Sequence, residues 1–334
     1  MYLLHIIFLR FLARHLPYIT GMGRPLRYMP EPHTLFEVTS RTMQGRFLLR
    51  PSRQLNELIL GIIGRAMRKY PVRLYLFVVL SNHMHLIVSA PNTKTLADFM
   101  CYIKGNIAKE AGRLHRWREK FWGRRYAAIA ILDDDSLMAR VNYLLANGCK
   151  EGLVARPGDW PGVHCVDALT KGRPLVGRWV DRTLQYEAGR DEGKDLNKFS
   201  TLYEVPLSTL PCFEGWSTKE QRSKWQLLVG EIEAETRRRL EQEQVTALGP
   251  RRIMALDPHD HPAQPNHTPQ PFCHAVEKSA VKFFRKAYDL FVDAYRQAQD
   301  LLTRGDPRSL SMFPDDCYLP PLALSLSPTA FSSA

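Results

Sequence analysis

The stretch Val72–Ser89, VRLYLFVVLSNHMHLIVS, decides the fold. Two apolar, β-branched runs flank a Ser-Asn pair, which predicts two buried strands joined by a sharp turn. His83 and His85 stand at the start of the second strand, where residues two apart point to the same face. Both imidazoles can therefore meet one cation. A lone His-X-His pair also fits one core histidine and one solvated histidine, so its meaning depends on the rest of the chain.

The composition is that of a globular protein with a basic surface. The chain has 334 residues, of which 45% are hydrophobic and 24% charged, so it can bury a sizeable core. The net charge of +12 favours a polyanionic partner, with nucleic acid as the leading candidate. Six irregularly spaced cysteines fit reduced thiols, and we expect a cytoplasmic protein.

Residues 1–23 form a doubtful N-terminal segment. This apolar run is interrupted by Arg10 and Arg14, is too short to span a bilayer and precedes no cleavage site. We therefore expect no membrane attachment and take Met22 as the better initiator.

The order of predicted elements indicates an α+β fold. Alternation of apolar residues predicts strands at Thr34–Arg41, in the Val72–Ser89 hairpin and at Tyr126–Leu132. Helical spacing predicts helices between and after them, at Gln54–Lys69, Thr95–His115 and Ser136–Ala146. Thr95 is the expected N-cap of the second helix, and Asp133 to Asp135 cap the third. This is the ferredoxin-like split βαβ pattern, an antiparallel sheet with helices on one face and one appended helix that carries the candidate nucleophile.

The remaining chain is expected to be a mostly helical C-terminal extension. After the core at 24–163, the composition predicts a basic, partly helical extension, a Pro- and His-rich linker, an amphipathic helix and a flexible tail, at 164–248, 249–273, 274–302 and 303–334.

The helix after the last strand adds two candidate site residues. Tyr143 and Asn147 are four apart and share one helix face. An amide oxygen suits Mg²⁺, imidazole suits Mn²⁺ passably, and a phenol beside a metal-bound phosphate is a candidate nucleophile. The alternatives are that Tyr143 fills the core with its ring and that Asn147 is a helix C-cap.

A basic and aromatic run follows the hairpin. Cations track a nucleic-acid backbone and aromatic faces stack on unpaired bases. The candidate DNA-binding residues are Lys104, Lys109, Arg113, Arg116, Trp117, Arg118, Trp122, Arg124 and Arg125, interleaved with Phe121 and Tyr126. A solvated helix face with two core aromatics explains the same pattern.

Together these motifs resemble the single-tyrosine HUH transposases, and within them the REP-associated tyrosine transposases. The likeness covers Arg24–Val163. It rests on NHMH, on the helix segment Tyr143-Leu-Leu-Ala-Asn147-Gly-Cys-Lys-Glu-Gly152-Leu-Val154, and on GLVARPGDWP. The family pattern has Pro where Gly148 stands here, and an aromatic residue and a serine where Gly162 and Val163 follow Trp-Pro.

The resemblance implies a transposase that cuts single-stranded DNA at hairpins of the REP type. Tyr143 would be the nucleophile, giving a 5′-phosphotyrosine, and His83, His85 and Asn147 would hold Mg²⁺ or Mn²⁺. The enzyme would act as a monomer or homodimer. Two alternatives stay open: a catalytically silent protein that binds DNA hairpins, and a metal-dependent phosphodiesterase that uses water.

Overall fold

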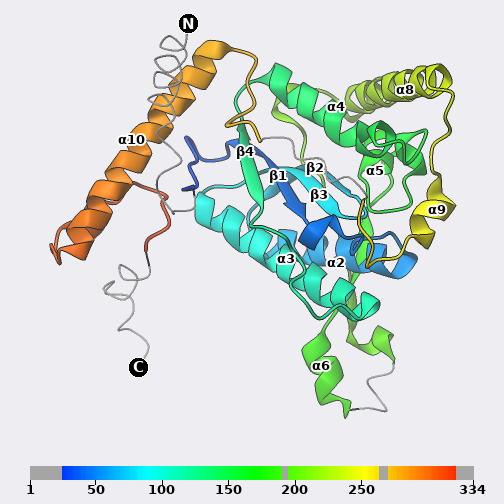
Figure 1. Cartoon of the computed structure of the whole chain (residues 1–334), viewed down its shortest axis with the longest axis horizontal. Coiled ribbons are helices and arrows are strands. Elements are labelled where there is room, and N and C mark those ends of the chain that lie inside the picture. Colours follow the sequence, from blue (N-terminus) through cyan, green and yellow to red (C-terminus); the bar gives the residue numbers. More distant parts are fainter. Residues whose placement is uncertain (1–24, 190–194, 263–269, 321–334) are drawn as a thin grey trace, which may run out of the picture. The chain divides into compact units, whose positions relative to one another are not determined.

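The computed structural model describes residues 25–189, 195–262 and 270–320 (Figure 1). The doubtful segment 1–23 lies outside these residues. Two compact units are distinguished, one at 29–291 and one that joins 25–28 to 292–320.

A four-stranded sheet is the centre of the larger unit. Its strand order is β2-β3-β1-β4, and every neighbouring pair is antiparallel. Helices α2 and α3 are the two crossovers, so the ferredoxin-like split βαβ prediction is confirmed. The elements are β1 (Leu35–Arg41), α2 (Arg53–Lys69), β2 (Arg73–Val79), β3 (His83–Ser89), α3 (Thr93–His115) and β4 (Ala127–Ile131).

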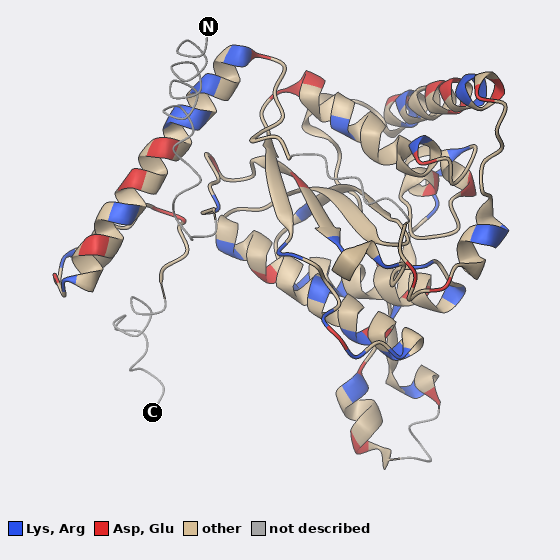
Figure 2. Ribbon diagram, in the orientation of Figure 1, with Lys and Arg blue, Asp and Glu red and all other residues tan. Residues whose placement is uncertain are grey.

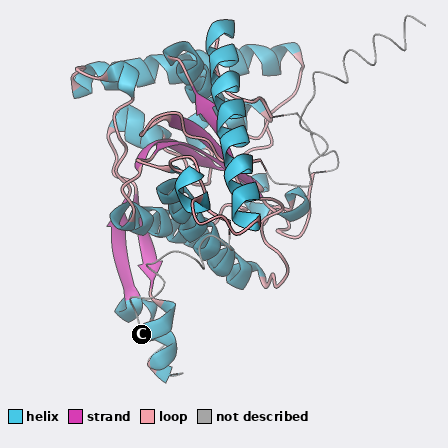
Figure 3. Cartoon of the chain, turned by 90° about the vertical axis from the view of Figure 1, so that its left-hand side faces the viewer, coloured by secondary structure: helices cyan, strands magenta, loops and turns pink. Residues whose placement is uncertain are grey.

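Alternation along β3 divides the sheet into an apolar face and a polar face. Met84 and Leu86 are buried, and Leu86 pairs with the buried Val38 of β1. On the other face, His85 stands opposite Thr39 of β1. Figures 1 and 3 show α2 and α3 on one side of the sheet and α4 on the other. The polar face is therefore the one that α4 can reach.

Capping residues differ in part from the sequence prediction. Asn92, not Thr95, is the N-cap of α3, and its side chain accepts a hydrogen bond from the Thr95 amide. Asp133 caps α4 (Asp134–Lys150) in the same way. The helix runs four residues beyond the predicted end, so Asn147 lies inside it and the C-cap reading of Asn147 is wrong.

The extension contains more regular structure than predicted. Residues 164–248 include a β-hairpin, the predicted linker includes a short helix, and the last long helix begins at Lys278 rather than at His274. The elements are α5 (Val166–Lys171), β5 (Val176–Val180), α6 (Arg182–Glu187), β6 (Ser200–Glu204), α8 (Thr218–Gln242), α9 (Pro250–Ala255) and α10 (Lys278–Thr303), with 3₁₀ turns at Met43–Gly45, Pro157–Asp159, Leu196–Phe199, Pro211–Phe213 and Ser309–Met312.

The extension also caps the C-terminal end of α4. The Arg239 guanidinium of α8 donates to the carbonyls of Cys149 and Lys150 at 2.6 and 3.0 Å. A cation at these last carbonyls stabilises the C-terminal end of the helix.

The smaller unit has its own apolar cluster. Ala298, Leu302 and Phe313 are buried together, and the Tyr295 ring lies 5.2 Å from that of Phe313. The chain that we expected to be a flexible tail from residue 303 is thus folded at least to Phe313. None of the helices in the described part of the chain has the length and apolar character that a membrane span needs.

The β5–β6 hairpin, the lower pair of magenta strands in Figure 3, lies against α2 at two glycines. A Cβ placed on Gly61 would overlap the main chain of Arg178, and one placed on Gly177 would overlap that of Gly61. The backbones meet directly, so even one methyl group must push the hairpin away.

We expect Gly61→Ala to lower the free energy of unfolding by about 1–3 kcal/mol, through overpacking. Gly105 of α3 is the matched control, because a Cβ there meets no atom within 4 Å. Gly105→Ala should raise stability by about 0.5–1 kcal/mol through helix propensity. Urea unfolding of both variants tests this, and equal effects would contradict the contact.

Candidate active site

Two histidines open β3 on the polar face of the sheet. The rings of His83 and His85 have centroids 5.0 Å apart and an interplanar angle of 81°. The predicted placement on one face is therefore confirmed, and the hydrogen bonds decide which nitrogen of each ring is available.

His83 is fixed by its neighbour in the turn. The Asn82 side-chain nitrogen donates to the Gly45 carbonyl at 3.0 Å, which orients that amide. Its oxygen, 2.6 Å from Nδ1 of His83, must accept, so Nδ1 carries the proton. Burial lowers the pKa of His83 well below its ordinary value, and the charges of His85 and Arg41 lower it further. The ring is neutral, with a lone pair on Nε2.

His85 is held from β1 in the same tautomer. Its Nδ1 lies 3.1 Å from Oε1 of Glu37 and 3.1 Å from Oγ1 of Thr39. An ionised carboxylate only accepts, so Nδ1 donates, and in the neutral ring Nε2 then keeps its lone pair. Carboxylate–histidine pairs of this kind orient metal ligands and raise their basicity.

Glu37 is the buried charge behind the histidines. Its side chain is 3% exposed, and Oε2 lies 2.7 Å from Nε of Arg140 and 2.8 Å from Nε2 of His274. Nη2 of Arg140 also donates to Oε1 at 2.9 Å. Burial alone would raise the pKa of Glu37, but the donors on His274, His85 and Arg140 outweigh it and hold the pKa well below the ordinary range. The carboxylate stays ionised.

Tyr143 reaches this cluster from α4. Its ring centroid lies 5.7 Å from that of His85, with an interplanar angle of 76°. The Arg140 guanidinium lies 4.0 Å from the ring centroid and the Lys150 ammonium 5.0 Å. Burial raises the pKa of Tyr143, although the charge of Arg140 opposes this, so the resting side chain is a phenol. The two cations are placed to favour the phenolate when a proton acceptor is present.

Asn147 is buried on α4, one turn after Tyr143, at 2% exposure. Its side-chain nitrogen has no hydrogen-bond partner among the described residues. A buried amide with an open position normally has a ligand or water to meet. The two amide ends exchange by rotation of the side chain, so its oxygen can take that position.

The donor set suits a hard or borderline divalent cation. Two imidazole Nε2 atoms have free lone pairs, and one amide is unsatisfied. Among residues 25–189, 195–262 and 270–320, no group of three or more His, Cys, Asp or Glu side chains could hold a metal ion. A metal at this site therefore depends on the amide of Asn147.

The competing tyrosines lie against other partners. Tyr102 also has an amide four residues later, but Asn106 donates back to the Tyr102 carbonyl at 2.8 Å. The Tyr102 ring stacks on Trp179, with centroids 5.9 Å apart. Tyr126 is buried at 8% exposure. Of these tyrosines, only Tyr143 has a ring contact with His85.

Most of the predicted DNA-binding cations are exposed along α3 and the loop after it (Figure 2). Lys109, Arg113, Arg116, Trp117 and Arg118 line one shallow hollow together.

Trp117 is part of a cluster. The Arg46 guanidinium lies 5.5 Å from its ring centroid and the His259 ring 5.6 Å.

The other aromatic residues of the run belong to the core. Trp122 is 9% exposed, and its indole nitrogen donates to the Lys104 carbonyl at 2.9 Å. Phe121 packs edge-on against it, with ring centroids 5.0 Å apart. Trp122 is therefore not available for base stacking in this structure, contrary to the prediction. Lys104 is only partly exposed and donates to the Arg124 carbonyl at 3.2 Å.

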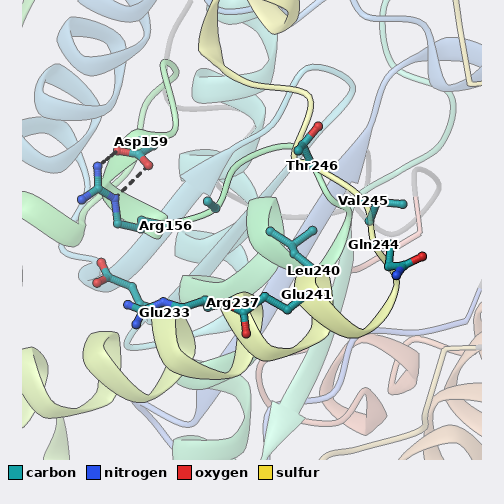
Figure 4. A pocket seen from close by; sticks show the side chains of 10 residues that line it. Arg156, Asp159, Glu233, Arg237, Leu240, Glu241, Gln244, Val245 and Thr246 are labelled. Carbon is teal, nitrogen blue, oxygen red and sulfur yellow. Dashed lines mark hydrogen bonds and ion pairs between the residues drawn. The ribbon is translucent and has the colours of Figure 1, made fainter.

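Another hollow lies between α8 and the segment around Arg156 (Figure 4). Its volume is about 600 Å³, and Arg156 pairs with Asp159 at 3.0 Å on its wall. None of the predicted site residues lines it.

Sequence reasoning missed Glu37, Arg140 and His274. Glu37 lies on the same face of the sheet as His85, but this can be predicted only once the pairing of β1 with β3 is known. Nothing in the local sequence points His274 toward β1.

Comparison with known proteins agrees with the predicted resemblance. Residues 48–146 match the family described as "Transposase IS200 like". No curated protein matches the chain.

Two solved structures are similar to parts of the chain. One is a REP-associated tyrosine transposase bound to a REP hairpin, with 24% identity over 42% of this chain and 81% of that chain and a TM-score of 0.36. The other is a candidate transposase from Deinococcus radiodurans, with 15% identity over 38% and 97% and a TM-score of 0.26.

We expect Glu37→Gln to lower the free energy of unfolding by about 2–4 kcal/mol at pH 7, because it leaves buried cations without their anion. Glu57→Gln is the control, since Glu57 is 40% exposed and pairs with Arg53 at the surface. Its effect should stay within about 0.5 kcal/mol.

The stabilisation by Glu37 should also depend on pH. A depressed pKa means that the charge of Glu37 stabilises the fold fully above the ordinary value of 4.5 and progressively less below it. The gap between wild type and Glu37→Gln should therefore shrink below pH 4.5 in urea unfolding. A constant gap would contradict the paired carboxylate.

Proposed function

Because residues 48–146 match the IS200-like transposases, we propose that this chain is a transposase that cuts and rejoins single strands of DNA through Tyr143. The observation that carries the proposal is the ring contact of 5.7 Å between Tyr143 and His85. It brings the ring of the candidate nucleophile against the imidazole of a candidate metal ligand.

His83, His85 and Asn147 would hold Mg²⁺ or Mn²⁺. The fit rests on the two Nδ1–H tautomers and on the unsatisfied amide. A cation bound there would polarise the scissile phosphate. The histidines contribute neutral ligands, and Glu37 keeps the ring of His85 in its orientation.

Tyr143 would attack the phosphorus. A bond forms from its phenol oxygen to the phosphorus as the bond to the 3′ oxygen breaks; the phenol loses its proton and the 3′ oxygen takes one up. Arg140 and Lys150 stabilise the developing phenolate from the ring faces. The 5′-phosphotyrosine keeps the energy of the broken bond, because a phenolate is a good leaving group. A 3′-hydroxyl can therefore reseal the strand without ATP.

The substrate would be single-stranded DNA next to a hairpin. The exposed cations of α3 and its following loop can follow a phosphate backbone, and the partly exposed Trp117 offers a ring for an unpaired base. Sequence resemblance to the REP-associated branch favours hairpins of that type.

The nucleophile is tested with labelled hairpin oligonucleotides that carry single-stranded flanks. We expect Tyr143→Phe to abolish both strand cleavage and the covalent protein–DNA adduct, because it removes the attacking oxygen and little else. DNA binding should change less than about twofold. Tyr102→Phe and Tyr126→Phe are the controls and should still form the adduct.

Mass spectrometry of the peptide–DNA conjugate locates the linkage. Cleavage that persists in Tyr143→Phe would favour a phosphodiesterase that uses water. Binding without cleavage by the wild type would favour the silent hairpin-binding protein.

The metal site is tested on the same substrate. We expect His83→Ala and His85→Ala each to lower the Mg²⁺- or Mn²⁺-dependent cleavage rate by at least about 100-fold while the fold survives. His261→Ala is the control, because His261 is exposed and its Nδ1 lies 3.0 Å from the neighbouring Pro262 carbonyl, away from the candidate site residues. Unchanged cleavage in either β3 variant would refute the site.

A further inference from the structure

A segment of the C-terminal extension lies against the edge of the central sheet. The main chain of His274 pairs in parallel with Ile131 of β4, the last strand in the sheet order. Its amide donates to the Ala130 carbonyl at 2.8 Å, and its carbonyl accepts from Leu132 at 2.9 Å. The Val276 amide donates to Asp133, the N-cap of α4. The extension is thus tied to the strand and the helix that frame the candidate site.

This pairing places the His274 side chain on Glu37. The imidazole is 11% exposed, and its Nε2 lies 2.8 Å from Oε2 of the carboxylate. The other oxygen, Oε1, faces Nδ1 of His85 at 3.1 Å. One carboxylate therefore links a residue of the extension to a histidine of the HUH-like pair, and His274 lies far outside the matched residues 48–146.

We propose that His274 is a positioning residue of the active site, which acts through Glu37 to hold His85 in its Nδ1–H tautomer and orientation. The extension then completes the site rather than merely following it. The role of His85 as a ligand rests on the proposed function, whereas the geometry of the three side chains does not.

The two oxygens of Glu37 show why a second partner matters. Arg140 contacts both of them, at 2.9 Å on Oε1 and 2.7 Å on Oε2. His274 approaches Oε2 alone, so it adds a second partner to that oxygen while Oε1 faces Arg140 and His85. Without His274, only Arg140 and His85 orient the carboxylate, and Nδ1 of His85 is held less firmly. The strand pairing involves only the main chain and persists when the side chain is replaced, which separates positioning from edge packing.

The test compares two replacements of His274 in the full chain. His274→Phe keeps a ring of similar size but removes the donor, whereas His274→Gln keeps an amide donor. His261→Phe is the matched control, an exposed histidine of the same extension. Imidazole ¹⁵N spectra of the metal-free proteins report the tautomer of His85 directly, and titration with Mn²⁺ reports the affinity of the site.

We expect His274→Phe to convert the single Nδ1–H pattern of His85 into a tautomer mixture and to weaken Mn²⁺ binding about tenfold. His274→Gln should restore both readouts, and His261→Phe should change neither. A wild-type His85 spectrum and Mn²⁺ affinity in His274→Phe would overturn the proposal. If His274→Phe does not fold, His274→Asn, too short to reach Glu37, must show the same changes.

Failure of the proposed function gives a different pattern. Wild-type protein that neither binds Mn²⁺ nor forms an adduct would remove the transposase assignment. The tautomer of His85 in the metal-free variants would still decide the role of His274.

Discussion

The candidate site depends on one buried charge, the carboxylate of Glu37. A charge at 3% exposure is tolerated only with close partners, and it has three, His85, Arg140 and His274. They come from β3, from α4 and from the extension, so one carboxylate ties together the sheet, the helix that carries Tyr143 and a segment distant in sequence. Because Glu37 only accepts hydrogen bonds, Nδ1 of His85 must donate to it, and in the neutral ring this leaves the outer nitrogen free.

The fold separates the tasks of recognition and chemistry. The polar face of the sheet supplies the two histidines, and α4 brings Tyr143 over them from that side. The cations expected to follow DNA lie on α3, one of the two helices that cover the opposite face, and in the loop that follows it (Figure 2). Arg140 of α4 has two roles. It neutralises Glu37, and its guanidinium lies 4.0 Å from the centroid of the Tyr143 ring. The extension supports this helix at both ends, through Asp133 and Arg239.

Local pattern was enough to predict the sheet and the histidine pair. A strand period of two placed His83 and His85 on one face, and a helical period placed Tyr143 and Asn147 together. Contacts between distant segments were beyond such reasoning. Glu37 is an ordinary alternating residue until the register of β1 against β3 is known, and His274 reaches it only through main-chain pairing with β4. The prediction that Trp122 stacks on DNA bases was wrong for the same reason, since its indole nitrogen is turned inward to donate to the Lys104 carbonyl.

The central claim is that His83, His85 and Asn147 converge on one cation beside Tyr143. Anomalous diffraction from crystals soaked in MnCl₂ tests it most directly. The account predicts one strong peak at about 2.0–2.3 Å from Nε2 of both histidines and the side-chain oxygen of Asn147. A peak bound through Nδ1 of either histidine, or strong binding elsewhere with none at this site, would contradict it.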